Sequence, residues 1–370
     1  MDIRNCLLLI NLVGVPVLTV LRLVEALHGG RLPAFAKNSV EGFVLYFGVT
    51  LVVDHDTVKP VRATTSQIIR KVFKTIVLFI ETSFLLSLLS AYNFQVFPST
   101  SNIFYWGNML NNLLAASVIS CALDTSCSFG EAALCIVTGG IHFADSHKSP
   151  MTKSTSVSNF WGQRWNRLVA DSLRRGAFGP MRRVMPRSVA SILTFLFSGV
   201  VHEYMLFVLE QARDYGEDTP PANNSMRVPY KHQLGHQFAF FIWNGFLLVL
   251  ERVFDNNRAL LWIQKNVPTV LRTTMVMFLV LPITHLFADE YDQSGIFRDI
   301  SMAFPRIQYM GPPTNSTLEI LPFDGMLVTF ATKHFIPGPV CPAENTSAGC
   351  NAVKYLFGAI GVLEESSSGI

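Results

Sequence analysis

Apolar residues occur along the chain in long blocks that are separated by short polar or charged segments. Six blocks approach the roughly 20 residues that a membrane-spanning helix needs. They are residues 5–24, 72–91, 103–121, 187–210, 234–254 and 268–287. Weaker blocks are short or interrupted by glycine, and are expected to be re-entrant, tilted or interfacial; they are 40–53, 128–143, 322–336 and 352–363. The pattern predicts an all-α protein, a multi-pass transmembrane bundle of about six to nine spans.

Composition supports this class. Half of the residues are apolar and only 15% are charged, which is unusual for a soluble protein of 370 residues. The chain has no internal repeat, low-complexity tract or separable soluble domain, so residues 1–370 are expected to form a single membrane domain. We interpret the first block as a retained span, because its start is weakly charged and no small-residue cleavage site follows it. The net charge of +3 gives no basis for a nucleic-acid partner.

The distribution of charge predicts an orientation. Residues 145–187 contain nine Lys and Arg residues against Asp145 and Asp171, so the positive-inside rule makes this segment cytosolic. The glycosylation-type triplets at Asn223, Asn315 and Asn345 then fall on the lumenal side, together with Cys341 and Cys350, which can pair there. A second basic cluster, Lys59 to Lys74, is also expected in the cytosol. That requires that blocks 40–53 and 128–143 do not each cross the membrane.

One spanning block contains two titratable residues. His202 and Glu203 lie deep within 187–210, where such groups usually face a protein interior or a water-filled cavity. Arg187 to His202 is 15 residues, or roughly 22 Å of helix. The sequence therefore predicts an intramembrane chamber around His202, enclosed by helices. Glu203 is expected to pair with an Arg or Lys of a neighbouring helix.

Upstream of this block lies a segment rich in tryptophan and arginine. At 100° per residue, Trp161 and Trp165 fall on one side of a helix, while Arg164 and Arg167 fall on the other. This spacing predicts one amphipathic helix in the membrane interface, with aromatic anchors and with basic groups directed to phosphates.

Two motifs together resemble a known family. They are Phe160-Trp161-Gly162-Gln163-Arg164-Trp165-Asn166 and, 36 residues after Asn166, Ser198-Gly199-Val200-Val201-His202-Glu203. This pair looks like the signature of the wax synthase branch of the membrane-bound O-acyltransferases. The resemblance extends over about residues 145–255, and Gln163 stands where the branch often has Arg.

The resemblance implies transfer of an acyl group from acyl-CoA to a hydroxyl in an endoplasmic-reticulum membrane, with no resident cofactor. His202 would be the general base, because a neutral imidazole can take the proton of an alcohol. Asn166 would orient this base or donate a hydrogen bond to the thioester carbonyl. The acyl-CoA would be bound by a further set of residues, in which arginine suits phosphate groups. That set is Trp161, Arg164, Trp165, Arg167 and Ser198.

Several alternatives stay open. A long-chain alcohol is the preferred acceptor and would give a wax ester. Diacylglycerol would give triacylglycerol, and acetyl-CoA with a sterol-like or terpenoid alcohol would give an acetate ester. In a different class, a membrane carrier would use His202 as a proton site. His232 and His236 have the one-turn spacing of metal ligands, but no third ligand is near, so a structural role is favoured and no metal is expected.

Overall fold

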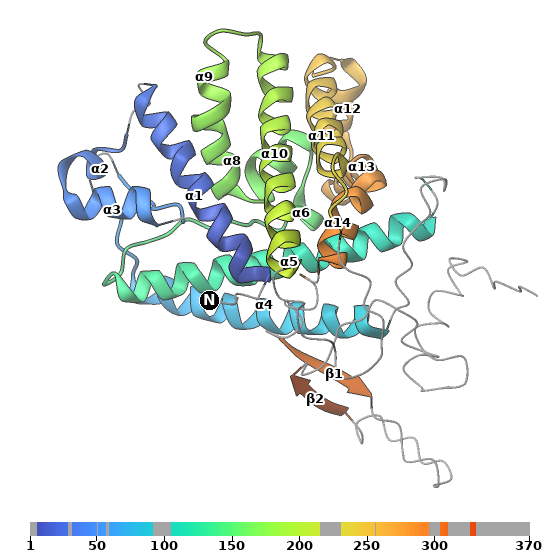
Figure 1. Cartoon of the computed structure of the whole chain (residues 1–370), viewed down its shortest axis with the longest axis horizontal. Helices are drawn as coiled ribbons and strands as arrows, with labels where there is room; N and C mark the ends of the chain where they lie inside the picture. The colour runs from blue at the N-terminus through green and yellow to red at the C-terminus, as the bar shows by residue number, and fades with distance from the viewer. Residues whose placement is uncertain are drawn as a thin grey trace, which may run out of the picture.

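The computed structural model describes residues 6–28, 32–49, 51–56, 59–91, 104, 106–214, 231–255, 257–294, 296, 304–309 and 326–330. The three glycosylation-type asparagines, Cys341, Cys350 and block 352–363 lie outside these residues. The described chain is predominantly helical, as the sequence predicts (Figure 1).

Two long helices, α4 (Thr65–Ala91) and α5 (Trp106–Val137), pack side by side as one layer (Figure 1). A reciprocal cap begins α4. The backbone N–H of Thr64 donates to Gln67 Oε1 (2.7 Å), and the N–H of Gln67 donates to Thr64 Oγ1 (3.3 Å). These two bonds satisfy amides that the first turn of a helix would otherwise leave unpaired.

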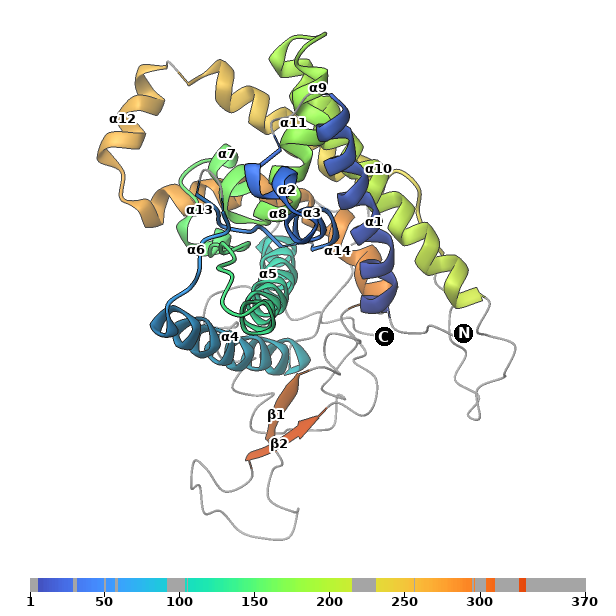
Figure 2. The same ribbon diagram turned by 90° about the vertical axis from the view of Figure 1, so that its left-hand side faces the viewer.

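A second group of helices crosses this layer (Figures 1 and 2). It comprises α1 (Cys6–Leu27), α10 (Arg187–Asp214), α11 (His236–Val253), α13 (Thr269–Val280) and α14 (Thr284–Gln293). Helices α10 and α11 pack closely because glycine occupies their contact. A Cβ on Gly199 would lie 3.2 Å from the Phe238 ring, and one on Gly245 would lie 3.1 Å from Phe195.

Helices α13 and α14 are joined by a single 3₁₀ turn, η3 (Leu281–Ile283). Pro282 lies within it and cannot donate the N–H that would continue the helix. Side chains from neighbouring helices bind the carbonyls around this break. Asn112 donates from Nδ2 to the Leu281 carbonyl (2.7 Å), and Gln237 donates from Nε2 to the Leu286 carbonyl (3.2 Å). The orientation of α14 is therefore fixed by α5 and α11.

Short elements make up the rest of the described structure. They are the helices α2 (Ala34–Asn38), α3 (Val40–Gly48), α6 (Pro150–Lys153), α7 (Val157–Asn159), α8 (Arg167–Leu173), α9 (Gly179–Met181) and α12 (Arg258–Asn266), the π-helical turns η1 (Phe160–Arg164) and η2 (Arg174–Phe178), and the strands β1 (Pro305–Tyr309) and β2 (Met326–Phe330). The two strands pair antiparallel. Block 322–336 was expected to be re-entrant, tilted or interfacial, and its described part is instead a strand.

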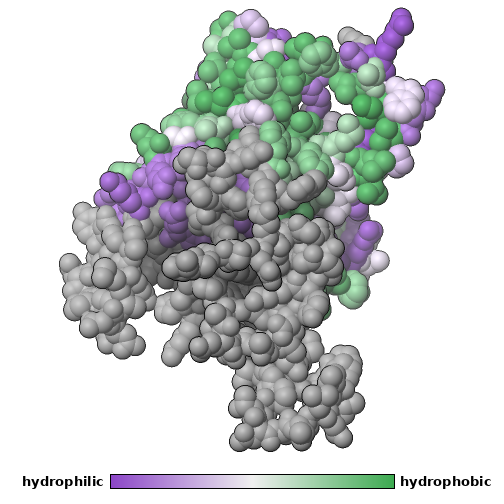
Figure 3. Space-filling view, turned by 90° about the vertical axis from the view of Figure 1, so that its right-hand side faces the viewer, coloured by the Kyte–Doolittle hydropathy of each residue, from purple (hydrophilic) through white to green (hydrophobic). Residues whose placement is uncertain are grey.

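Three described helical segments are long and apolar enough to cross a membrane, Asn108–Val137, Arg187–Gln211 and Thr269–Gln293, or four if α11 and α12 form one broken span. The predicted count of six to nine spans is not confirmed by the described residues. Figure 3 shows hydrophobic residues gathered over the upper part of the face that α11, α12 and α13 form. Large apolar side chains there are exposed, among them Trp262 and Val270. Such a face is expected of helices that contact lipid.

Two of the weak apolar blocks do not form separate helices that are long enough to cross a membrane. In block 40–53, α3 is nine residues long, and Val53 then pairs with Phe143 in an isolated antiparallel bridge. In block 128–143, the helical part is the end of α5, and Ile141 then pairs with Arg62. Residues 52–54 and 61–63 thus lie beside residues 140–144.

Candidate active site

His202 lies on α10 in a pocket of aromatic side chains. Its ring stacks on Phe241 of α11, with centroids 4.8 Å apart and planes at 25°, and Phe287 of α14 meets it at 5.2 Å with planes at 65°. The Tyr291 hydroxyl lies 2.5 Å from His202 Nδ1. Phe287 and Tyr291 are one helical turn apart and so face the same side of α14. The hydrogen-bond partner of His202 is thus a residue that sequence reasoning missed.

Glu203, the next residue, has a separate role. Its Oε1 accepts hydrogen bonds from the backbone N–H groups of Gly235 (2.9 Å), Gln237 (3.1 Å) and Phe238 (3.2 Å). These groups form the N-terminus of α11, where a carboxylate is stabilised by unpaired amides and by the helix dipole. Gly235 has φ +108°, a left-handed conformation that favours glycine. Glu203 therefore fixes α11 against α10.

The expected Arg or Lys partner of Glu203 is wrong, because the partner is His232. His232 Nε2 lies 2.6 Å from Glu203 Oε2, and its Nδ1 lies 2.6 Å from Glu290 Oε2. His236 Nδ1 is 3.3 Å from Glu290 Oε1. Carboxylate oxygens therefore lie close to both nitrogens of the His232 ring.

This buried carboxylate–histidine cluster ties α10, α11 and α14 together next to His202. Glu290 lies beyond the predicted apolar block 268–287, but α14 continues through it and its side chain is 1% exposed. The sequence feature that could have predicted this continuation of the helix is the one-turn spacing of Phe287 and Tyr291, which is typical of a helix. Among the described residues, no group of three or more His, Cys, Asp and Glu side chains could hold a metal ion.

The tryptophan-rich signature is divided into two parts. Trp161 and Arg164 lie in the π-helical turn η1, and the chain then becomes extended at Asn166 (φ −153°, ψ 90°) before α8 begins. Asn166 Oδ1 accepts the backbone N–H of Val169 at 3.2 Å and so caps α8. The expected continuous amphipathic helix is thus interrupted at Asn166, since the asparagine side chain starts a new helix. The Nδ2 group of Asn166 takes no part in this cap.

Aromatic contacts link the signature to His202. The Trp165 ring stacks on Phe160 at 5.3 Å, Phe160 meets Trp161 at 4.9 Å, and Trp161 meets Phe240 at 6.0 Å. The series continues from Phe240 to Phe287 at 5.0 Å, and Phe287 reaches His202. Trp161 is also anchored on α11, because its Nε1 donates to Asn244 Oδ1 at 3.0 Å. Trp161, Trp165 and His202 therefore border one aromatic cluster.

The other predicted residues have different surroundings. Arg164 donates from Nε to Asn159 Oδ1 (2.6 Å) and from a terminal nitrogen to the Lys148 carbonyl (3.1 Å). Arg167 donates to the Asp145 carbonyl (3.3 Å). Both arginines thus hold the segment before the signature in place. Ser198 is buried on α10, one turn before His202.

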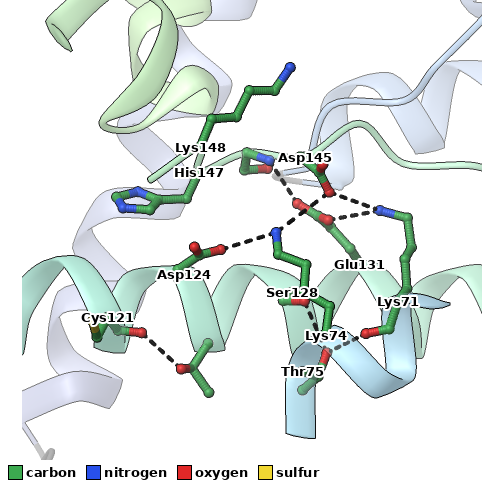
Figure 4. A network of polar contacts seen from close by, with 12 residues as sticks. Lys71, Lys74, Thr75, Cys121, Asp124, Ser128, Glu131, Asp145, His147 and Lys148 are labelled. Atoms are coloured by element: carbon green, nitrogen blue, oxygen red, sulfur yellow. Dashed lines mark hydrogen bonds and ion pairs between the residues drawn. The ribbon is translucent and has the colours of Figure 1, made fainter. Parts of the chain in front are cut away.

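The segment that precedes the signature rests on an ionic layer between α4 and α5 (Figure 4). Lys71 Nζ lies 2.9 Å from Glu131 and 3.5 Å from Asp145, while Lys74 Nζ lies 3.2 Å from Asp124 and 3.7 Å from Asp145. Burial would raise the pKa of Asp145, but Lys74 and Lys71 hold it below its usual range. Lys71 and Lys74 thereby meet the basic segment 145–187 on one face of the molecule.

Comparison with known proteins identifies the signature segment. The profile of the Membrane bound O-acyl transferase family matches residues 146–220. Over 72 residues, 17% of this chain and 21% of the relative, the chain is 40% identical to probable long-chain-alcohol O-fatty-acyltransferase 7 of Arabidopsis thaliana. Over 74 residues, 18% of this chain and 21% of the relative, it is 39% identical to long-chain-alcohol O-fatty-acyltransferase of Simmondsia chinensis.

A third relative is acyl-CoA–sterol O-acyltransferase 1 of Arabidopsis thaliana, which is 26% identical over 151 residues, 39% of this chain and 37% of that protein. The match spans 21% of each of the first two relatives. Residues 146–220, which contain both signature motifs, are thus similar to the membrane bound O-acyl transferase family and to proteins named long-chain-alcohol O-fatty-acyltransferases.

Proposed function

We propose that this protein is an acyl-CoA-dependent O-acyltransferase that esterifies a lipid alcohol in the endoplasmic-reticulum membrane. In this proposal the whole chain forms a single domain. A long-chain alcohol is the preferred acceptor and a wax ester the product. The observation that carries the proposal is the aromatic pocket in which His202 meets Tyr291, bordered by Trp161 of the signature. Two relatives are named for this reaction.

The proposed chemistry is one direct transfer without an acyl-enzyme. His202 Nε2 takes the proton of the alcohol as its oxygen attacks the thioester carbonyl. The C–O bond forms, the C–S bond breaks, and the protonated imidazole returns its proton to the leaving thiolate. For Nε2 to act as the base, Nδ1 must carry the ring proton and donate it to Tyr291 Oη, which lies 2.5 Å away. Tyr291 would then hold the tautomer that the reaction needs.

The aromatic surroundings support an apolar substrate. Phe241, Phe287 and Phe240 lie around or beside the His202 ring, and such linings are usual for sites that bind hydrocarbon chains. We assign the acyl-CoA to the aromatic cluster and the adjoining basic segment, with Trp161, Trp165 and Ser198 nearest the acyl chain. Acyl-CoA is a cosubstrate in this proposal, and no resident cofactor is needed.

The decisive experiment compares wild-type protein with His202→Ala in yeast microsomes. Wild-type membranes should form wax ester from a fatty acyl-CoA and a long-chain alcohol. His202→Ala should lower that rate at least ~100-fold while membrane insertion is unchanged, since general-base catalysis contributes about that much. Tyr204→Phe, an exposed position on the same helix, is the matched control. Normal ester synthesis by His202→Ala would disprove the general-base role, whereas no ester synthesis by wild-type membranes would favour a carrier.

A sterol acceptor is the second candidate, because one matched relative is named a sterol O-acyltransferase. The same membranes should be assayed with sterol, diacylglycerol and long-chain alcohol, each with long-chain acyl-CoA and acetyl-CoA. A higher kcat/KM for a sterol than for a long-chain alcohol would replace the wax synthase assignment.

A further inference from the structure

A charged cleft opens beside the signature. It has a volume of about 460 Å³ and lies between the C-terminal end of α1, the turn η2 and the short helix α9. Titratable side chains line it: Glu25, His28, His55, Arg174, Arg175 and Arg183. Figure 1 shows α9 beside the start of α10, the helix that carries His202.

Close backbone packing builds the walls of this cleft. A Cβ on Gly176 of η2 would lie 2.3 Å from the Leu21 carbonyl oxygen of α1. Only glycine therefore allows η2 to approach α1 so closely. Arg174 is held by its own contacts, since it donates to the Gly162 carbonyl (2.8 Å) and pairs with Asp171 (3.2 Å). The cleft is thus attached both to α1 and to the signature turn η1.

Positive charge exceeds negative charge on these walls. Three guanidinium groups line the cleft, against one carboxylate on its wall, Glu25. That carboxylate already accepts the Tyr46 hydroxyl at 2.9 Å and lies 3.8 Å from Arg175. Counting Asp171 beside Arg174, one positive charge remains when both histidines are neutral. Planar guanidinium groups match phosphate oxygens in bidentate geometry.

We propose that this cleft binds the phosphate groups of the nucleotide end of the acyl donor. The proposal rests on the proposed acyl-CoA-dependent reaction and names residues for it that the sequence did not single out. Arg164 and Arg167, the expected ligands, are instead engaged with carbonyl oxygens and Asn159 of the chain itself. Arg175 and Arg183 replace them as the phosphate-binding pair.

Helix α10 begins near α9, which borders the cleft, and carries His202 further along its length. From Arg187 to His202 is 15 residues, or roughly 22 Å. A donor with its phosphates in the cleft and its thioester at His202 must carry a long, thin arm between the two. Acyl-CoA has such an arm in its pantetheine portion, and an S-acyl-pantetheine keeps the arm and the thioester without the nucleotide phosphates.

The test uses the double variant Arg175→Gln/Arg183→Gln of the full chain in detergent. The KM for acyl-CoA should rise at least ~10-fold with little change in kcat, because the lost contacts act on binding. Activity with S-acyl-pantetheine should stay within about twofold of wild type. Adenosine 3′,5′-bisphosphate, titrated by calorimetry, should bind to wild type and lose at least ~10-fold in affinity in the variant. Arg258→Gln on α12, exposed and outside the cleft, is the matched control.

An equal effect on both donors, or unchanged bisphosphate binding, would overturn the phosphate assignment. A response only to phosphatidate in the detergent micelles would also overturn it, because the cleft would then bind a lipid headgroup. If wild type makes no ester from any donor, the proposed function is wrong, and the bisphosphate titration alone decides the cleft. Circular dichroism of each variant verifies that it is folded.

Discussion

The pocket around His202 and the ionic layer between α4 and α5 both enclose titratable groups, but in opposite ways. His202 is surrounded by aromatic rings and has one described hydrogen bond, to Tyr291. Lys71 and Lys74 each have two carboxylates within 4.0 Å. Paired charges stabilise a packing arrangement, whereas a histidine without a counterion can change its protonation during a reaction. Local pairing thus distinguishes the structural groups from the candidate base.

The largest expected effect is the loss of stability when a substitution breaks the ionic layer. Lys71→Met leaves Glu131, whose side chain is 2% exposed, without its ammonium partner at 2.9 Å. Removing one member of a buried pair costs about 3–5 kcal/mol. The apparent unfolding temperature in detergent should fall sharply. The esterification rate of the protein that stays folded should be near wild type, since this layer lies outside the aromatic pocket.

Two controls accompany this substitution. Lys71→Met/Glu131→Gln should recover much of the lost stability, because it removes both charges. Lys74→Met, at a half-exposed lysine, should cost less than Lys71→Met. Equal losses of stability in all three variants would show that the ion pair between Lys71 and Glu131 does not stabilise the protein.

The second largest effect concerns His147, which lies between the two regions. Its ring is buried and its Nε2 lies 2.9 Å from Ser120 Oγ. Burial lowers the pKa of His147 to about 4. The unfolded chain therefore takes up a proton below about pH 6.5 while the folded chain does not, so stability should fall from pH 7 to pH 5. The loss is roughly 2 kcal/mol.

The measurement is thermal unfolding in detergent at both pH values. His147→Gln keeps a hydrogen-bonding side chain and removes the titration, so its apparent midpoint should change less with pH than that of wild type. If the unfolding midpoint of His147→Gln changed more steeply with pH than that of wild type, the pH dependence could not be assigned to His147.

A smaller effect, on kcat, is expected when the hydroxyl that contacts the candidate base is removed. Tyr291→Phe keeps the ring that packs against His202 and removes the hydrogen bond to Nδ1. Loss of tautomer control should lower kcat about tenfold, or ~1.4 kcal/mol, with the KM for acyl-CoA unchanged. The pH dependence of kcat should also shift. If Tyr291→Phe changes neither kcat nor its pH profile, then Tyr291 only fills space.

The smallest effect tests what Asn166 does. Asn166→Asp keeps the oxygen that caps α8 and removes the amide N–H₂ group, while Asn166→Ala removes both. Loss of the cap costs about 1 kcal/mol. If Asn166 is catalytic through Nδ2, both variants should lose turnover to a similar extent. If it acts only as a cap, Asn166→Asp should retain the wild-type rate and Asn166→Ala alone should be less stable.

Sequence reasoning predicted much of the fold because the helices have strong local signals. All six strong apolar blocks overlap described helices, and the two motifs that carry the family resemblance lie in the matched residues 146–220. Three interpretations failed for physical reasons. Asn166 caps a new helix and so interrupts the amphipathic one; Glu203 caps α11 and pairs with a histidine; and part of block 322–336 pairs as a strand.

By itself, the sequence determined that this chain is an apolar, helical protein with a histidine deep in a long helix and with two motifs that resemble those of membrane-bound O-acyltransferases. These properties depend on hydropathy and on short motifs, which neighbouring residues encode. Only the tertiary structure decided that Tyr291 contacts His202, that Glu290 and Glu203 enclose His232, and that Arg175 and Arg183 share a cleft with α1. Those contacts join residues that are dozens to well over a hundred positions apart, and they form when helices pack, so no local pattern contains them.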